Sequence, residues 1–214
     1  MTESIIFDLD GTLWDSSDSV AEAWTTVLRQ QDDPAISSIT VTKENMFAIM
    51  GKAMDEIAAI LFPMLNADTQ MELLQKCMDH ENGYVAQHGG SLFADEMVLS
   101  DLAKNRRLFI VSNCQKGYIE AFLTFSGFGR YFTDHMCWGD TLKPKSFTIR
   151  ELMTRNGCTD AAYVGDTQGD CDASYDAGIP FIHAAYGFGS ISTPDRVNAS
   201  ISSLDLLSVT LDKL

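Results

Sequence analysis

Apolar and polar residues follow one another along the chain in two kinds of block. Short, nearly continuous apolar runs are typical of strands buried on both faces. Longer stretches with apolar residues three or four positions apart are typical of amphipathic helices. The short runs predict strands at 5–7, 107–111, 135–138, 161–164 and 180–183. The longer stretches predict helices near 18–31, 42–50, 54–61, 68–85, 94–104, 116–126, 146–156 and 171–177.

The order of these blocks predicts an α/β protein with one interruption. Strands alternate with helices, which indicates a parallel sheet covered by helices on both faces. Residues 16–85, however, show only helical patterns. We therefore expect an α/β core domain of residues 1–15 and 86–214 and an inserted all-helical domain of residues 16–85, with 14–16 as the first hinge. Ligands of such sheets bind at the carboxyl ends of the strands, where this insert would lie as a lid.

Methionine is concentrated in the predicted helical insert, at Met46, Met50, Met54, Met64, Met71 and Met78. A flexible thioether side chain fills irregular gaps in an apolar core. We interpret this methionine-rich face as core packing, the commoner use, rather than as a binding surface.

Composition limits the class of protein and its partners. The chain has 214 residues and a net charge of −15. That charge disfavours nucleic acid or an anionic membrane surface as the main partner. No apolar run of about 18 residues predicts a membrane span, and Glu3 leads directly into a strand, unlike a signal peptide. Because the five cysteines show no paired spacing, we expect free thiols and a cytoplasmic protein.

Two acidic residues follow the first predicted strand. Asp8 and Asp10 are two positions apart, so their side chains leave the strand on the same side. Such a pair is favourable when a cation lies between the acids or when one acid is protonated. Gly11 allows a tight turn and the close approach of a ligand. Thr12 adds a hydroxyl and an amide that can face an anion.

Polar residues also follow three later segments of the predicted sheet. They are Ser112 and Asn113, Lys143 and Lys145, and Asp166 and Asp170. Because the carboxyl ends of parallel strands meet at one edge, we expect these side chains to converge there with the first acid pair. Carboxylates suit a hard cation such as Mg²⁺, and a lysine with a hydroxyl suits an anion. The set therefore favours phosphoryl transfer through Mg²⁺.

Four motifs carry a resemblance to a known family. They are Phe7-Asp8-Leu9-Asp10-Gly11-Thr12, Ser112 at a strand end, a lysine within 143–145, and Gly165-Asp166-Thr167-Gln168-Gly169-Asp170. Together they resemble the haloacid dehalogenase superfamily, and within it the phosphoglycolate phosphatase-like members with a helical cap. The resemblance covers nearly the whole chain. It implies a Rossmann-like parallel sheet with an inserted helical cap domain.

The resemblance also implies a role for each acid. Asp8 would be the nucleophile that forms an aspartyl-phosphate, and Asp10 would protonate the leaving alcohol and then activate water. Mg²⁺ would be held by Asp8, the backbone carbonyl of Asp10, and Asp166. Asp170 would be a further ligand or would hold waters of the metal.

By the same resemblance, Ser112 and one lysine would hold the transferring phosphoryl oxygens, together with amides that include that of Asn113. Relatives with Lys-Pro-x-Pro select Lys143, whereas relatives with the lysine directly before a helix select Lys145. The choice stays open, with a slight preference for Lys145 at the positive end of a helix that we expect to begin at Ser146.

In the insert, Gly51-Lys52 resembles a loop that contacts the substrate in related phosphatases. A helix-breaking glycine beside an ordinary exposed lysine is an equal alternative.

The sequence therefore predicts a Mg²⁺-dependent phosphatase of a small phosphorylated metabolite, phosphoglycolate-like or a phosphosugar, acting as a monomer or weak dimer. A phosphosugar mutase would use the same acids and return the phosphoryl group to a bound sugar. Dehalogenation needs no metal and no second acid, so Asp10 and Asp166 disfavour it, whereas Lys52 keeps phosphonate cleavage open. Outside the enzymes, a binding or regulatory module is the alternative.

Overall fold

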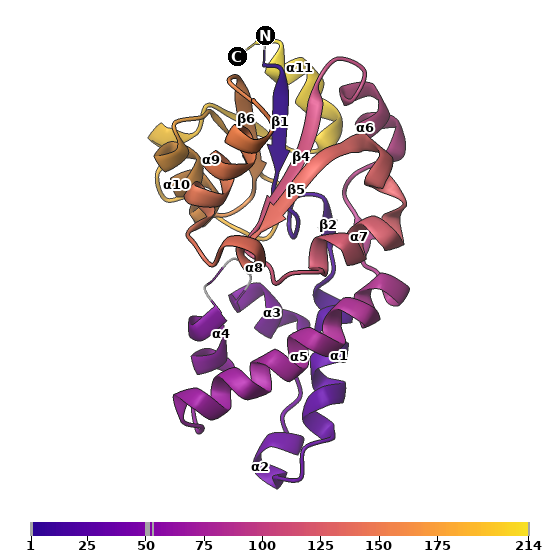
Figure 1. Cartoon of the computed structure of the whole chain (residues 1–214), viewed down its shortest axis with the longest axis vertical. Coiled ribbons are helices and arrows are strands. Elements are labelled where there is room, and N and C mark those ends of the chain that lie inside the picture. The colour runs from indigo at the N-terminus through magenta and orange to yellow at the C-terminus, as the bar shows by residue number, and fades with distance from the viewer. Residues whose placement is uncertain (1, 50–51, 53, 214) are drawn as a thin grey trace.

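The structure is a computed structural model that describes residues 2–49, 52 and 54–213 of the chain, shown in Figure 1. Its strands are β1 (Ser4–Phe7), β2 (Trp14–Asp15), β3 (Ser91–Leu92), β4 (Arg107–Ser112), β5 (Phe132–Cys137), β6 (Ala161–Gly165), β7 (Phe181–Ala184) and β8 (Ala199–Ile201). Its helices are α1 (Ser17–Arg29), α2 (Pro34–Ser37), α3 (Lys43–Ile49), α4 (Met54–Leu61), α5 (Ala67–His88), α6 (Glu96–Leu102), α7 (Tyr118–Ser126), α8 (Trp138–Thr141), α9 (Lys145–Arg155), α10 (Gln168–Ala177) and α11 (Leu207–Leu211). Three short 3₁₀ helices, η1 (Phe128–Tyr131), η2 (Pro194–Arg196) and η3 (Leu204–Leu206), complete the described elements.

Six strands form one sheet in the order β5–β4–β1–β6–β7–β8, and every neighbouring pair is parallel. Strand β1 lies between β4 and β6, with Phe7 opposite Ile110 and Val164. The α/β fold with a parallel sheet is therefore confirmed. Because these strands run in one direction, the residues that follow β1, β4 and β6 meet at one edge.

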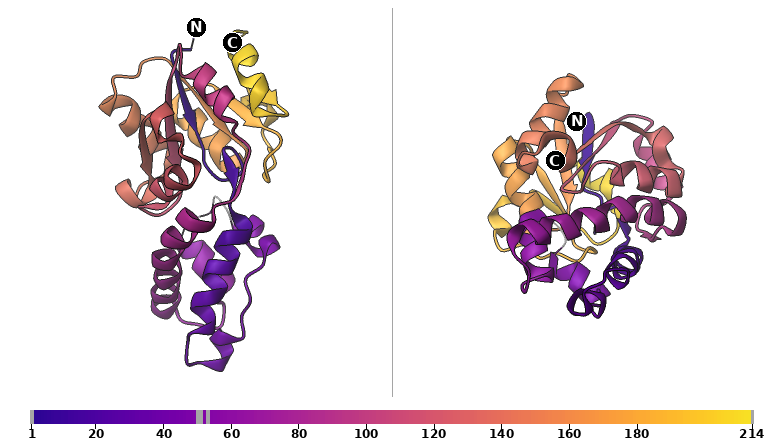
Figure 2. Two further views of the ribbon diagram at one scale, coloured as in Figure 1. Left: turned by 90° about the vertical axis from the view of Figure 1, so that its right-hand side faces the viewer. Right: turned by 60° about the horizontal axis from the view of Figure 1, so that its bottom comes forward.

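Helices cover both faces of this sheet (Figures 1 and 2). Ile6 packs with Ile149 and Leu152 of α9 on one face. Ile5 and Phe7 belong to the core on the other face, which includes side chains of α6, α7 and α11. Burial of alternate residues on opposite faces explains why the last three residues of β1, Ile5, Ile6 and Phe7, are all apolar.

Helices α1 to α5 lie beyond the carboxyl edge of the sheet (Figure 1). Every regular element described between residues 16 and 88 is a helix, and α1 packs along α5. We refer to α1–α5 as the helical insert. The domain limits predicted at 15/16 and 85/86 stay a prediction. In the part of the chain that the structure describes, no helix has the length and apolar character needed to cross a membrane.

Two short segments join the helical insert to the sheet, and they pair with each other. Trp14 and Asp15 of β2 lie antiparallel to Leu92 and Ser91 of β3. A Cβ atom on Gly90 would lie 2.3 Å from the carbonyl oxygen of Asp15, so only glycine permits this approach. We call this two-stranded ribbon the stalk. The sequence indicated a hinge at 14–16 but not the pairing, because two-residue strands show no periodicity.

One predicted strand was displaced and several short elements were missed. Strand β5 begins at Phe132, three residues before the predicted strand, and Trp138 already belongs to α8. β5 is an edge strand whose first residues are partly exposed, so its apolar run is short. The edge strand β8 and the four-residue helices α2 and α8 gave no recognisable pattern.

Candidate active site

The turn after β1 brings its two acids to the carboxyl edge of the sheet. The amide of Asp8 donates to the carbonyl of Val164 over 2.8 Å, which extends the pairing of β1 with β6. Gly11 has a φ of +79°, and a Cβ atom there would lie 2.3 Å from Oδ2 of Asp166. Glycine is therefore required where this turn approaches the loop after β6, as its position in the sequence suggested.

Lys145 is the first residue of α9, and its ammonium group lies among the acids. Nζ is 3.0 Å from Oδ1 of Asp8 and 2.6 Å from Oδ1 of Asp170, and the residue is only 7% exposed. Burial alone would lower the pKa of this lysine, but Asp170 and Asp8 together raise it. Lys143 is exposed to solvent. Of the two candidate lysines, the structure therefore brings Lys145 to the acid cluster.

Asp170 is held from two sides. Its Oδ2 accepts hydrogen bonds from the amide and the hydroxyl of Thr167, at 3.0 and 2.7 Å, in a capping box at the start of α10. Its Oδ1 accepts from Lys145. Although burial opposes it, Lys145 and Thr167 hold the pKa of Asp170 below its ordinary value. Both oxygens are thus engaged within the protein, in an arrangement that positions Lys145.

Asp8, Asp166 and Asp170 each bring one carboxylate oxygen to within 4.8 Å of the others. Oδ2 of Asp166 accepts from the amides of Phe188 and Gly189, at 2.9 and 3.0 Å. Its buried Oδ1 has no hydrogen-bond partner among the described residues. Burial and the charge of Asp170 raise the pKa of Asp166 to about 7 and raise that of Asp8 well above its ordinary value. Clustered carboxylates with an unsatisfied oxygen fit a divalent cation such as Mg²⁺.

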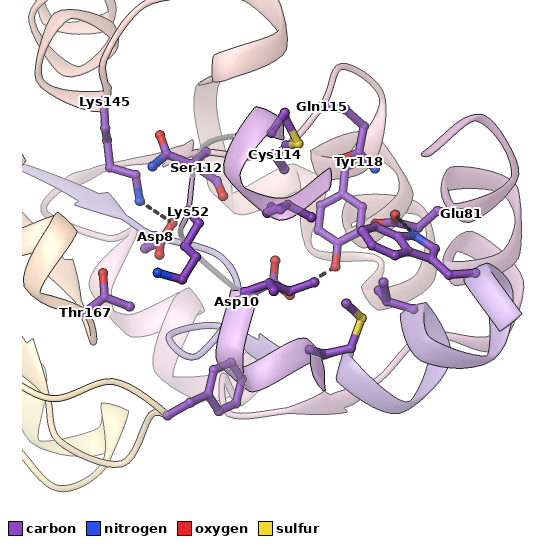
Figure 3. A pocket seen from close by; sticks show the side chains of 18 residues that line it. Asp8, Asp10, Lys52, Glu81, Ser112, Cys114, Gln115, Tyr118, Lys145 and Thr167 are labelled. Carbon is purple, nitrogen blue, oxygen red and sulfur yellow. Dashed lines mark hydrogen bonds and ion pairs between the residues drawn. The ribbon is translucent and has the colours of Figure 1, made fainter. Parts of the chain in front are cut away.

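Asp10 lies apart from that cluster of three acids. Its Oδ1 accepts hydrogen bonds from the hydroxyls of Ser16 and Tyr118, at 2.7 and 3.0 Å, and Figure 3 shows the tyrosine contact. Burial raises the pKa of Asp10 to about 6, and the two hydroxyl groups oppose that rise. Asp10 is thus suited to gain and lose a proton near neutral pH.

A cavity of about 90 Å³ opens between the sheet edge and the helical insert (Figure 3). Side chains at the sheet edge form one wall: Asp8, Asp10, Ser112, Asn113, Cys114, Gln115, Tyr118, Lys145, Thr167 and Phe188. The helical insert forms the other: Val20, Trp24, Met46, Ile49, Lys52, Met54, Ile57 and Glu81. The cavity therefore joins the acid cluster to a mainly apolar surface.

The predicted substrate-contacting residues have different positions. Ser112, Asn113 and Lys52 line the cavity, and Lys52 also forms an ion pair with Glu56 at 3.0 Å. Thr12 is fully buried, its amide donates to the carbonyl of Leu9, and it is not part of the cavity wall. Gly51 lies outside the described residues. The roles assigned to these residues stay predictions.

Met46 and Met54 belong to the apolar core and also line the cavity. These two methionines thus border the cavity as well as packing in the core, and Met50 lies outside the described residues. Met64 and Met71, by contrast, are exposed.

Sequence reasoning missed several residues that complete the site. Tyr118 contacts Asp10, Glu81 lines the cavity, and the amides of Phe188 and Gly189 hold Asp166. The sequence Gly187-Phe188-Gly189, which follows β7 after Ala185 and Tyr186, was a usable signal for these two amides. Tyr118 and Glu81 lie on helices, where neighbouring residues give no such signal.

Comparison with known proteins gives concordant matches. The model of the haloacid dehalogenase-like hydrolase family matches residues 5–184. The phosphoglycolate phosphatases of Escherichia coli O157:H7 and Yersinia pseudotuberculosis are 28% and 26% identical to this chain, and each match covers 94% of this chain and 90% of the relative. The solved structure of a haloacid dehalogenase-like family hydrolase from Streptococcus pneumoniae matches with a TM-score of 0.78 and 19% identity, covering 100% of this chain and 99% of that chain. At that identity, the structural match shows a shared fold.

Proposed function

This chain belongs to the haloacid dehalogenase-like hydrolase family, and we propose that it is a Mg²⁺-dependent phosphatase acting on small phosphate monoesters through a covalent intermediate on Asp8. One observation carries the proposal: Lys145, Asp166 and Asp170 surround Asp8 in a buried cluster beside a cavity. The phosphoglycolate phosphatases among the relatives support a phosphate ester as the class of substrate.

Asp8 and Asp166 would hold the Mg²⁺ ion, with Asp170 beside them. The free Oδ1 of Asp166 and the raised pKa values of Asp8 and Asp166 support this assignment, because a cation relieves the repulsion between buried acids. When bound, the cation neutralises the acids and polarises a phosphoryl oxygen.

In the first step, the carboxylate of Asp8 attacks phosphorus. The bond from phosphorus to the ester oxygen breaks, and its electron pair passes to the leaving oxygen, which takes a proton from Asp10. Lys145 holds Asp8 in place through the 3.0 Å contact, and the hydroxyl of Ser112, in the same cavity wall, donates to a phosphoryl oxygen.

In the second step, Asp10 acts as a base. It takes a proton from water as the water oxygen attacks phosphorus. The bond between phosphorus and Asp8 breaks, which restores the carboxylate and releases inorganic phosphate. A pKa of about 6 allows Asp10 to donate a proton in one step and to accept one in the next.

In this proposal the helical insert acts as the cap domain. It supplies the apolar wall of the cavity, and the stalk joins it to the sheet. Leaving groups would contact this wall while the sheet edge carries out the reaction. Lys52 is the cationic side chain of the described part of that wall.

Hydrolysis of p-nitrophenyl phosphate by the purified chain tests the proposal. We expect turnover with Mg²⁺, loss of turnover with a chelator, and a fall of about 10³-fold or more in Asp8→Asn. Asp101→Asn is the matched control, because Asp101 is an exposed acid that forms a surface ion pair with Lys104, and it should keep full activity. Turnover that persists in Asp8→Asn would overturn the covalent scheme. A wild-type chain inactive on every ester tested would favour a binding module instead.

A further inference from the structure

Glu81 is a buried acid in the cavity that the proposed reaction does not use. It lies on α5, is 4% exposed, and lines the same cavity as Asp8 and Lys145. Figure 3 shows Glu81 on the far side of Asp10 and Tyr118 from Asp8. A phosphate ester bound at Asp8 would therefore extend its leaving group past Asp10 toward Glu81.

Neutral side chains hydrogen bond to the carboxyl group of Glu81. The indole Nε1 of Trp24 donates to its Oε2, and the side chain of Gln115 also hydrogen bonds to it. Neither partner brings a positive charge. Burial of a carboxyl group without a positive charge nearby costs free energy. A ligand that places another hydrogen-bond donor beside the carboxyl group reduces this cost, so such a ligand should bind more tightly.

The wall of the cavity that the helical insert supplies together with Glu81 is mainly apolar. It is formed by Val20, Trp24, Met46, Ile49, Met54 and Ile57. Side chains of this kind bind the carbon skeleton of a ligand and leave the terminal group to the few polar residues. Among the described residues of the helical insert, those polar residues in the cavity are Glu81 and Lys52.

The charges of the cavity disfavour a second anionic group on the substrate. Lys145 is already paired with Asp8 and Asp170, and Lys52 is paired with Glu56. Above a pH of about 8, where Glu81 is ionised, a leaving group ending in a carboxylate would face its negative charge in a low-dielectric site, where repulsion between anions is strong.

We propose that Glu81 determines the specificity of this site by accepting a hydrogen bond from a donor group, a hydroxyl or an ammonium, at the far end of a mainly apolar leaving group. The inference rests on the proposed phosphatase activity and adds the class of ester. While Glu81 is ionised, esters whose leaving group ends in a carboxylate, such as phosphoglycolate, are then poor substrates, even though the named relatives are phosphoglycolate phosphatases.

A matched series of esters tests this inference. Alkyl phosphates of two to six carbons are compared at equal length with a terminal amine, hydroxyl, methyl or carboxylate, in the presence of Mg²⁺ and at pH 9, above the pKa of about 8 of Glu81. For the wild-type chain, we expect kcat/KM to be at least about tenfold higher for the better of the amine and hydroxyl esters than for the carboxylate ester. The methyl ester should fall between them. A carboxylate ester equal to or better than both donor esters would overturn the inference.

The variant Glu81→Gln tests whether this selectivity among esters depends on the Glu81 side chain. The ratio of kcat/KM for donor and carboxylate esters should fall toward one, mainly through KM. Because it is a ratio within one protein, a general loss of activity does not affect it. Glu72→Gln, an exposed acid on the same helix, should keep the wild-type ratio. An unchanged ratio in Glu81→Gln would contradict the assignment.

The series also separates this inference from the proposed function. Hydrolysis of p-nitrophenyl phosphate without discrimination among the alkyl esters would refute only the role of Glu81. No hydrolysis of any ester would refute the phosphatase proposal itself. Should Glu81→Gln fail to fold, the wild-type series alone still decides the predicted order of substrates.

Discussion

The two walls of the cavity differ in what surrounds their acidic side chains. On the wall at the sheet edge, acids lie close together, and Lys145 and the amides of Phe188 and Gly189 engage them. On the wall from the helical insert, apolar side chains surround the buried acid Glu81. Charges held in fixed positions suit bond making and breaking, whereas an apolar wall with one polar group suits selection of a ligand. Changes in the two walls should therefore alter different kinetic constants.

The largest effect is expected at Lys145. Lys145→Met would leave Asp8 and Asp170 buried without their cation, so kcat should fall by about 10³-fold or more. The free energy of unfolding without Mg²⁺ should fall by about 3 kcal/mol. Kinetics and urea unfolding measure the two effects. Lys143→Met, two residues away and exposed, should change neither quantity, and an equal effect of the two substitutions would refute the placement of Lys145.

Glu81 should make stability depend on pH. Burial raises the pKa of Glu81 to about 8 from an ordinary value of 4.5, although Gln115 and Trp24 oppose the rise. The folded chain then holds a proton that the unfolded chain releases, so this residue lowers stability as pH rises from about 4.5 to about 8. Asp10 and Tyr118 face Glu81, and Cys77 also interacts with it.

Glu81→Gln removes this loss of stability at higher pH, because glutamine does not titrate. The free energy of unfolding of the variant relative to wild type should therefore increase by about 3 kcal/mol between pH 5 and pH 8. Urea unfolding at several pH values measures this difference. Asp10 also titrates in this range, but it is present in both proteins, so its contribution largely cancels in the difference between their free energies of unfolding. A difference that does not vary with pH would show that Glu81 is ionised in the folded chain throughout.

A smaller effect is expected at Tyr118, which acts through Asp10. Tyr118→Phe removes the 3.0 Å hydrogen bond to Asp10 and leaves the one from Ser16. We expect kcat to fall about tenfold with little change in KM, because one of two contacts that orient the acid is lost. Tyr131→Phe, which removes a hydroxyl that donates to Glu96, is the matched control. A change in KM alone would assign Tyr118 to substrate binding instead.

The smallest effect is expected where the two walls touch. Phe47 of α3 lies against Phe188, with ring centroids 4.7 Å apart, and Phe188 lines the cavity. Phe47→Ala should raise KM by a few fold, equivalent to about 1 kcal/mol, and leave kcat nearly unchanged. Met97→Ala, an exposed residue on α6, should have no effect. A large fall in kcat would show that the ring contact also controls the position of Asp166.

The sequence predicted that acids would meet at the sheet edge, because chain direction brings the ends of parallel strands together. Asp8, Asp166 and Asp170 meet for that reason. It did not decide between Lys143 and Lys145, since that choice required the start of α9 to within one residue. We expected the helix to begin at Ser146, and it begins at Lys145.

The wall from the helical insert was much less predictable. Glu81 is one of several acids on α5, and its burial depends on contacts with Trp24 and Gln115, which are distant in sequence. Met46 and Met54 carry the same helical spacing as core residues, so periodicity cannot show that they border a cavity. Which side chains of the helical insert border the cavity depends on the packing between helices, and local sequence does not show that packing.

The stalk limits how the two walls of the cavity can move relative to each other. Two separate linkers would let the helical insert tilt, twist and slide against the sheet. In the stalk the two linkers pair as β2 and β3, and the amides of Phe93 and Ala94 also donate to the carbonyl of Leu13. A paired ribbon bends across its face more easily than it shears along its length. We therefore expect the entrance for a substrate to widen and narrow through essentially one angle, with both walls keeping their own shape.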